Sequence, residues 1–388
     1  MGVRYSGRAA PRKQKGTTTI PTKGSVRRIL LLSAPLALRG TSLYTVSLAR
    51  ELKLLGHKVA VLCPGGTLEG SLTEQDIEPI RAPVSGVGWR DLLYLNVFVD
   101  KARDFEPEVV HVQSHALARI GMHLASALGA APVVTVHSSL RSQLPLAGGP
   151  PPLAIAVSED VRQALVTAGR FPRDRIEVIP NGVSASLSSL ELDDRVGAED
   201  EVPVVGTVSR LARGRGVEHF LDAARAVVDS GAKAQFLVIG EGPAERELRA
   251  QARRLELTPH ITFALPRARI GDLIRPLDVF VSAGESEGHG MFILCAMAEA
   301  RAVICTGVGG VLSFVRDGSN GLLVGRGDVA ALTQRILGLL GAPEERRRLG
   351  RQALKDVREE FSLHPMIERT VEVYDRAVAE TAASFTKA

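Results

Sequence analysis

The sequence has few of the residues that mark several common classes of protein. Among its 388 residues there are three cysteines, at Cys63, Cys295 and Cys305, and only 4% of the chain is aromatic. Three scattered cysteines form neither a disulfide framework nor a metal site, so we expect a reducing compartment and no metal. The shortage of aromatics argues against stacking platforms for single-stranded nucleic acid, and we expect no nucleic-acid partner.

Two nucleotide-binding fingerprints are also missing. The first apolar run leads into SAPLALRGTS rather than G-x-G-x-x-G, which disfavours a nicotinamide or flavin site, and no P-loop pattern occurs. No apolar run has the length of a membrane span. The stretch VRRILLLSAPLALRG has the basic and apolar regions of a secretory signal. Because an amphipathic helix and another apolar run follow it, as in an α/β domain, we interpret it as a buried strand of a cytoplasmic protein.

The positive charge is concentrated at the start of the chain. The formal net charge is +5, yet residues 1–28 contain eight Lys and Arg and no acidic residue, so the remainder is slightly acidic. Residues 1–26 are polar and contain Pro and Gly, which predicts a disordered tail. A tail of this kind suits peripheral contact with a membrane; a solvated leader is the alternative.

Beyond the tail, short apolar runs alternate with amphipathic helical segments. Runs of Val, Ile and Leu without polar alternation predict strands buried on both faces, and hence parallel sheets. Repeated βα units and the chain length predict an α/β fold with two doubly wound, Rossmann-like domains. The polar stretch near residues 184–200 is the best boundary. We predict domains over 27–190 and 191–360, and a C-terminal helix over 361–388.

Candidate binding residues lie at the turns after the strands, where open α/β sheets bind ligands. Arg210 and Arg215, in VSRLARGRG, stand between a strand and a helix, where they would hold a diphosphate or be ordinary surface arginines. The loop GESEGHGMF offers backbone N–H groups to phosphate, and its Glu287 suits either sugar hydroxyls or helix capping. His137 ends a strand and is either catalytic or structural. Gly40 fits a tight strand-to-helix turn.

Taken in order, these pieces resemble the family 4 retaining glycosyltransferases of the GT-B fold, over residues 28 to about 376. The resemblance rests on the segments LRGTSLYTVSLARELKLLGHKVAVL, VTVHSS, IAVSEDV, VIPNGV, VGTVSRLARGRGVEHFLDA, LVIGEGP, DVFVSAGESEGHG and DGSNGLLV. It implies that the C-terminal domain binds a UDP-, GDP- or ADP-sugar and that the N-terminal domain takes a lipid, polysaccharide or small-molecule acceptor. It also implies that neither a cofactor nor a metal is required.

The resemblance further implies roles for single residues around the donor phosphates. Arg210 matches a diphosphate contact, and Arg215 occupies a position where the family usually has lysine. That change keeps the charge but alters the geometry. Gly40 matches one glycine of a loop near the phosphates, while Arg39 replaces its partner glycine.

On the sugar side, His137 matches a histidine near the transferred sugar, and Glu287 matches the first acid of a Glu-x7-Glu motif that contacts sugar hydroxyls. Gly288 and Gly290 belong to the same phosphate-binding loop. Cys295 stands where the second acid would grip the nucleotide ribose. A thiol is a poor acceptor, and losing one hydrogen bond to a charged group weakens binding about tenfold to a hundredfold.

Other positions also depart from the family pattern. Glu299 lies one helical turn beyond Cys295 and is an alternative ribose ligand. Ala300, Arg301 and Ala302 replace a Gly-x-Pro, Ser313 replaces an acid, and the acceptor-side segment containing GGPPP is short. The sequence therefore predicts a retaining glycosyltransferase that moves a hexose. A binding or scaffold subunit that has lost transfer, and a nucleotide-sugar epimerase, stay open as alternatives.

Overall fold

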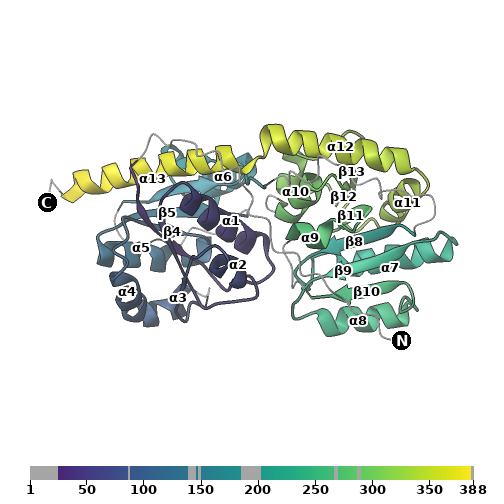
Figure 1. The fold of residues 1–388 in the computed structure, drawn as a ribbon, viewed down its shortest axis with the longest axis horizontal. Helices are drawn as coiled ribbons and strands as arrows, with labels where there is room; N and C mark the ends of the chain where they lie inside the picture. The colour runs from purple at the N-terminus through teal and green to yellow at the C-terminus, as the bar shows by residue number, and fades with distance from the viewer. Residues whose placement is uncertain are drawn as a thin grey trace, which may run out of the picture.

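The computed structural model describes residues 25–85, 88–138, 146, 150–184, 202–265, 270–285 and 290–385. The chain folds into two lobes that lie side by side (Figure 1). The predicted disordered tail and most of the predicted boundary segment fall outside the described residues. Each lobe is built around a parallel sheet, as the unbroken apolar runs predict.

The N-terminal sheet has the strand order β3-β2-β1-β4-β5-β6-β7. Its strands are β1 (Arg28–Leu32), β2 (Lys58–Cys63), β3 (Pro79–Arg81), β4 (Val109–Val112), β5 (Ala131–Val136), β6 (Leu153–Ala156) and β7 (Ile176–Val178). The helices of this lobe are α1 (Gly40–Leu54), α2 (Gly70–Thr73), α3 (Gly88–Asp91), α4 (Leu95–Arg103), α5 (Ala118–Leu128) and α6 (Glu159–Thr167).

The C-terminal sheet has the order β10-β9-β8-β11-β12-β13. Its strands are β8 (Val204–Val208), β9 (Gln235–Ile239), β10 (Ile261–Ala264), β11 (Val279–Ser282), β12 (Ala302–Thr306) and β13 (Leu322–Val324). The remaining helices are α7 (Val217–Asp229), α8 (Glu245–Arg254), α9 (Ile270–Ile274), α10 (Met291–Ala298), α11 (Val329–Leu340), α12 (Pro343–Glu360) and α13 (Leu363–Phe385). Short 3-10 turns occur at Leu92–Tyr94, His115–Leu117, Arg173–Arg175 and Gly309–Ser313.

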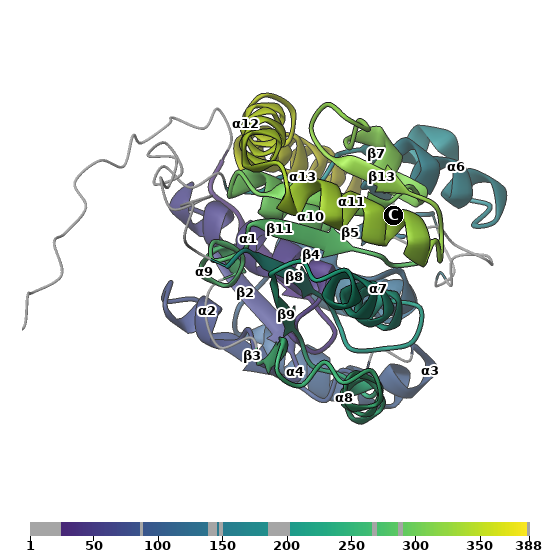
Figure 2. The same ribbon diagram turned by 90° about the vertical axis from the view of Figure 1, so that its right-hand side faces the viewer.

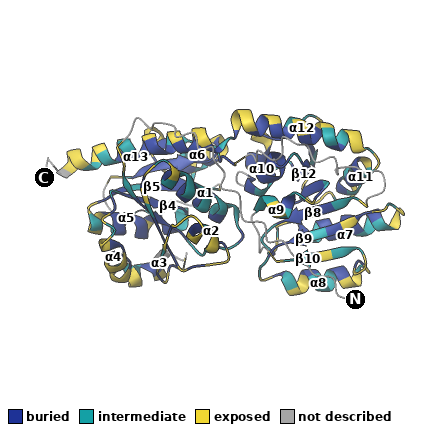
Figure 3. Cartoon of the chain, viewed as in Figure 1, coloured by how far each residue is buried: buried dark blue, intermediate teal, exposed yellow. Residues whose placement is uncertain are grey.

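Both sheets lie in the centre of their lobes, and the helices expose their outer faces to water (Figure 3). Every residue of β4, β6 and β12 is buried. Helix α12 begins with Pro343 in its first turn, a position that proline favours because the N–H it lacks has no partner there. A view along the long axis shows α12 almost end-on above the sheets (Figure 2).

The C-terminal helix α13 leaves the C-terminal lobe and packs against β4, β5 and β6 of the N-terminal lobe. The junction before it touches the chain segment that leaves the N-terminal lobe. The N–H of Val183 donates to the carbonyl of Phe361 at 2.9 Å, and a Cβ on Gly182 would lie 2.6 Å from the carbonyl oxygen of Ser362. The two chain segments that run between the lobes therefore lie against each other.

Candidate active site

A cavity of about 300 Å³ lies between the two lobes. Its N-terminal wall comes from the loop after β1 and the start of α1, and from the residues that follow β4 and β5. Its C-terminal wall comes from the residues after β8 and the start of α10. The cavity thus sits at the carboxyl ends of both parallel sheets, where ligands bind in folds of this class.

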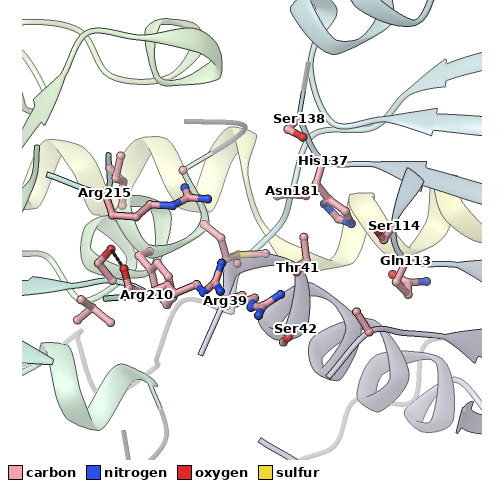
Figure 4. Close-up of a pocket in the computed structure, with 18 of the residues that line it drawn as sticks. Arg39, Thr41, Ser42, Gln113, Ser114, His137, Ser138, Asn181, Arg210 and Arg215 are labelled. Atoms are coloured by element: carbon pink, nitrogen blue, oxygen red, sulfur yellow. Dashed lines mark hydrogen bonds between the residues drawn. The ribbon is translucent and has the colours of Figure 1, made fainter. Parts of the chain in front are cut away.

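Three arginines face this cavity, namely Arg39 from the N-terminal lobe and Arg210 and Arg215 from the C-terminal lobe (Figure 4). No Asp or Glu is among the described residues that line it. The pKa of Arg39 is lowered by burial and by the positive charges of Arg210 and Arg215, while Glu241 acts in the opposite direction. The cavity is therefore electropositive and suited to an anion.

Glycines bring the backbone close enough to hold these arginines in place. Gly216, next to Arg215, has φ of +77°, and a Cβ there would lie 2.0 Å from the carbonyl oxygen of Ala283. The turn after β9 likewise presses on the Arg210 loop, since a Cβ on Gly240 would lie 2.0 Å from the carbonyl oxygen of Ser209. A side chain at either glycine would push the two loops apart.

The starts of two helices meet at the cavity. A Cβ on Gly40, the first residue of α1, would lie 3.1 Å from the Cβ of Met291, the first residue of α10. Gly290 precedes α10 with φ of +49°. The first turn of a helix has backbone N–H groups without partners inside the helix, so both helices present donors and the positive ends of their dipoles here.

His137 lines the cavity directly after β5, and a buried polar cluster lies behind it. The ring of Tyr44 meets the His137 ring edge-on, with 4.7 Å between centroids. Burial raises the pKa of Tyr44 to about 12, although Thr135 and Thr370 act in the opposite direction. Tyr44 is therefore a neutral hydroxyl at ordinary pH, and it fixes the position of the imidazole through packing.

The cluster continues from His137 to the C-terminal helix. His111 Nδ1 lies 2.6 Å from the Tyr374 hydroxyl, and its Nε2 lies 2.7 Å from Oγ1 of Thr135. Burial and the neighbouring His137 lower the pKa of His111 to about 3. A neutral His111 therefore connects α13 to β5, the strand that precedes His137.

Two polar residues of the cavity wall escaped the sequence analysis. Gln113 is 2% exposed and Asn181 is 4% exposed, and the side-chain oxygen of each is buried without a hydrogen-bond partner among the described residues. Buried acceptors of this kind are costly unless a ligand or water pairs them. Their positions gave a signal, because Gln113 follows a buried strand and Asn181 lies in the VIPNGV turn.

The structure brings five of the predicted site residues together at the cavity, and these are Gly40, His137, Arg210, Arg215 and Gly290. Glu287 and Gly288 lie outside the described residues. Their roles therefore stay predictions.

The substituted positions after this loop are not among the described residues that line the cavity. Cys295 is not among the described residues that line the cavity. The residue is 9% exposed, and burial, with the nearby Glu299, raises the pKa of its thiol to about 12. Its predicted role beside the ribose stays a prediction. Glu299 is no free substitute either, because its carboxylate pairs with Arg275 at 3.2 Å. The hydroxyl of Ser313 donates to the carbonyl of Gly310 at 2.7 Å.

Two family models match the chain, one in each lobe. The model described as Glycosyltransferase Family 4 matches residues 38–187, and the model described as Glycosyl transferases group 1 matches residues 202–342. A 2-deoxystreptamine N-acetyl-D-glucosaminyltransferase from Streptomyces fradiae is 30% identical over 308 residues, which cover 71% of this chain and 72% of that protein. The chain belongs to glycosyltransferase family 4. As a member of that family it is an enzyme of glycosyl transfer, as the sequence predicted.

Other relatives match different shares of the chain. An alpha-maltose-1-phosphate synthase from Mycolicibacterium smegmatis is 28% identical over 380 residues, which cover 88% of this chain and 96% of that protein. A 2-deoxystreptamine glucosyltransferase from Streptomyces kanamyceticus is 30% identical over 217 residues, and the match spans only 55% of its length.

Solved structures confirm the predicted GT-B fold. The structure of Anabaena Alr3699/HepE in complex with UDP and glucose has a TM-score of 0.73 at 19% identity, covering 90% of this chain and 99% of that one. Sucrose-phosphate synthase from Thermosynechococcus elongatus has a TM-score of 0.72 at 19% identity, covering 91% and 99%. Within the part of the chain that the structure describes, no helix is long and apolar enough to cross a membrane.

Proposed function

We propose that this family 4 enzyme is a retaining glycosyltransferase that moves a hexose from a nucleoside diphosphate sugar to an acceptor hydroxyl. The observation that carries the proposal is the cavity between the lobes, where Arg210 and Arg215 face His137 across a space without a described carboxylate. The arginines suit a diphosphate, and His137 with the polar wall around it suits a sugar. Solved structures of the same fold contain UDP or UDP-glucose, which makes UDP the first nucleotide to test.

In the proposed reaction the acceptor hydroxyl attacks the anomeric carbon from the face that the diphosphate leaves. The bond between the anomeric carbon and the phosphate oxygen breaks, and its electron pair goes to the departing diphosphate. The acceptor proton passes to that diphosphate. Arg210, Arg215 and the N–H groups at the start of α10 stabilise the charge that develops on the diphosphate, and such fixed donors act where charge appears in the transition state.

The N-terminal wall would hold the transferred sugar and the attacking hydroxyl. The unpaired oxygens of Gln113 and Asn181 are acceptors for sugar or acceptor hydroxyls, and both residues line the same cavity as His137. Glu287, which the family resemblance assigns to the donor sugar, would act from the C-terminal lobe. The groups of the N-terminal wall would determine which hexose and which acceptor the enzyme accepts.

Calorimetric titration with UDP, GDP and ADP tests the donor site. We expect one nucleotide to bind the native chain and to bind Arg210→Ala at least tenfold more weakly, because a charge-assisted contact is lost. Arg213→Ala is the matched control: Arg213 lies in the same loop, its side chain is 87% exposed, and it pairs with Glu247 away from the cavity. Equal binding by the native chain and Arg210→Ala would refute the diphosphate assignment.

A second experiment tests retention. The native enzyme is incubated with the matching sugar nucleotide and candidate acceptors, and NMR assigns the anomeric configuration of the product.

A further inference from the structure

Arg39 is the residue of the cavity that the family pattern does not explain. The resemblance to family 4 implies a glycine at this position, and the chain has the longest cationic side chain instead. Arg39 is the extended residue before α1, with φ of −142° and ψ of 151°, so its side chain stands beside the free N–H groups of that helix. Its Nε is buried without a hydrogen-bond partner among the described residues.

The surroundings of Arg39 place two like charges and one opposite charge, that of Glu241, near its guanidinium. The guanidinium groups of Arg39 and Arg210 lie near each other in Figure 4, and that of Arg215 points toward the same space. Glu241, the carboxylate that interacts with Arg39, already accepts hydrogen bonds from the N–H of Leu38 and the hydroxyl of Thr67. Three guanidinium groups from two lobes therefore face one cavity, and no described acidic residue lines it with them.

We infer that Arg39 is a third diphosphate-binding residue, contributed by the N-terminal lobe, and that a bound diphosphate thereby holds the two lobes together. The inference rests on the proposed function, because it takes the anion to be the donor diphosphate. Like charges on opposite walls repel each other when the cavity is empty, and a polyanion between them converts that repulsion into attraction. A glycine in this place would leave the diphosphate with contacts on the C-terminal wall and the helix start alone.

The test compares Arg39→Gln, Arg39→Lys and the control Arg213→Ala, using whichever of UDP, GDP and ADP binds the native chain. Calorimetry at several salt concentrations gives the affinity and its ionic dependence. Small-angle X-ray scattering with and without the nucleotide gives the radius of gyration. Glutamine keeps much of the side-chain length without the charge, and lysine restores the charge without the planar fork.

We expect Arg39→Gln to bind the nucleoside diphosphate about ten- to a hundredfold more weakly, with a shallower salt dependence, and Arg39→Lys to recover part of the loss. The matching nucleoside without phosphates should bind the native chain and Arg39→Gln alike. The nucleotide should reduce the radius of gyration of the native chain and Arg213→Ala, but less so that of Arg39→Gln.

If Arg39→Gln binds the nucleotide as tightly as Arg213→Ala does, and its radius of gyration decreases as much, the inference is overturned. The proposed function would still stand. A native chain that binds none of the three nucleotides would overturn both. Equal weakening of nucleoside and nucleoside diphosphate binding in Arg39→Gln would show a structural role for Arg39, and it would also overturn the inference.

Discussion

The carboxylate of Glu241, in the C-terminal lobe, accepts a hydrogen bond from the hydroxyl of Thr67, in the N-terminal lobe, with 2.9 Å between the two oxygens. The same carboxylate oxygen accepts the backbone N–H of Leu38 at 3.3 Å. One side chain of the GEGP turn thus connects the loop after β9 to two loops across the cleft. A Cβ on Gly242 would lie 2.3 Å from the carbonyl oxygen of Leu211, so this turn is fixed to its own lobe.

Glu241→Ala should therefore weaken the contact between the two lobes in the nucleotide-free enzyme. We expect a larger radius of gyration in solution scattering and faster hydrogen exchange at the Leu38 amide, because both cross-lobe hydrogen bonds are lost. Glu247→Ala is the control, since that carboxylate is exposed on α8 and pairs with Arg213. If the two variants have the same hydrogen exchange at the Leu38 amide and the same radius of gyration, Glu241 does not hold the lobes together.

Ala300 has a left-handed backbone, with φ of +55°, at a position where the family resemblance implies glycine. A Cβ at a left-handed position costs roughly 1–2 kcal/mol, so its removal stabilises the folded state. Part of this stabilisation is offset, because glycine has greater conformational freedom in the unfolded chain. Ala300→Gly should raise the free energy of unfolding by about 1 kcal/mol. Urea denaturation followed by circular dichroism measures it.

Ala296→Gly, in the helix that precedes Ala300, should have the opposite effect on stability. Ala296 is a buried residue of α10 with ordinary helical surroundings, so glycine there should lower the free energy of unfolding by about 1 kcal/mol or more. If both substitutions lower the free energy of unfolding, backbone strain at Ala300 does not limit stability.

Much of the fold and part of the site could be predicted from local patterns. Unbroken apolar runs located most of the strands, and the turns at their carboxyl ends located Arg210, Arg215 and His137. The three-residue edge strands β3 and β13 were not predicted, whereas β7, of the same length, was.

Other features depend on contacts between distant segments. The side chains of His111 and Tyr374 are separated by 263 residues along the chain, so no local pattern indicates that α13 packs on the N-terminal sheet. Helix α10 is apolar on all sides, and seven of its eight residues are buried. Its sequence therefore has no polar stripe to show which face meets the ligand, and the orientation of Cys295 could not be predicted.

Cys295→Glu, which restores the acid that the family resemblance implies, should destabilise this chain. The new carboxylate would stand in the core one helical turn from Glu299, and both burial and a like charge disfavour its ionised form. We expect a loss of more than about 2 kcal/mol in the free energy of unfolding at pH 7. Cys295→Ser, which adds no charge, should lose less.

The pH dependence identifies the cause. A glutamate whose pKa is raised in the folded state binds more protons folded than unfolded, so its penalty is present near neutrality and decreases as the pH falls. Cys295→Glu should therefore recover stability relative to Cys295→Ser between pH 7 and pH 5. Parallel curves for the two variants would show that residue 295 reaches solvent or a counter-charge.

His111 should make the enzyme sensitive to acid. Its folded pKa is about 3, well below the ordinary value of 6.5, because burial and His137 oppose its protonation. The unfolded chain therefore binds one more proton at this site as the pH falls from about 6.5 toward 3. Stability should be complete above pH 6.5 and decrease by about 1.4 kcal/mol per pH unit within that window from this residue alone.

His111→Asn separates this effect from the loss of packing. The variant should be less stable at pH 7, because the hydrogen bonds with Tyr374 and Thr135 are weakened, but its stability should fall less steeply between pH 6 and pH 4.5. His364→Gln, at an exposed position near the start of α13, should retain the native slope. Urea denaturation at each pH measures all three chains. If the free energy of unfolding of His111→Asn falls with pH as steeply as that of the native chain, other groups cause the acid sensitivity. His57 and His115 are such groups, because burial lowers their pKa values as well.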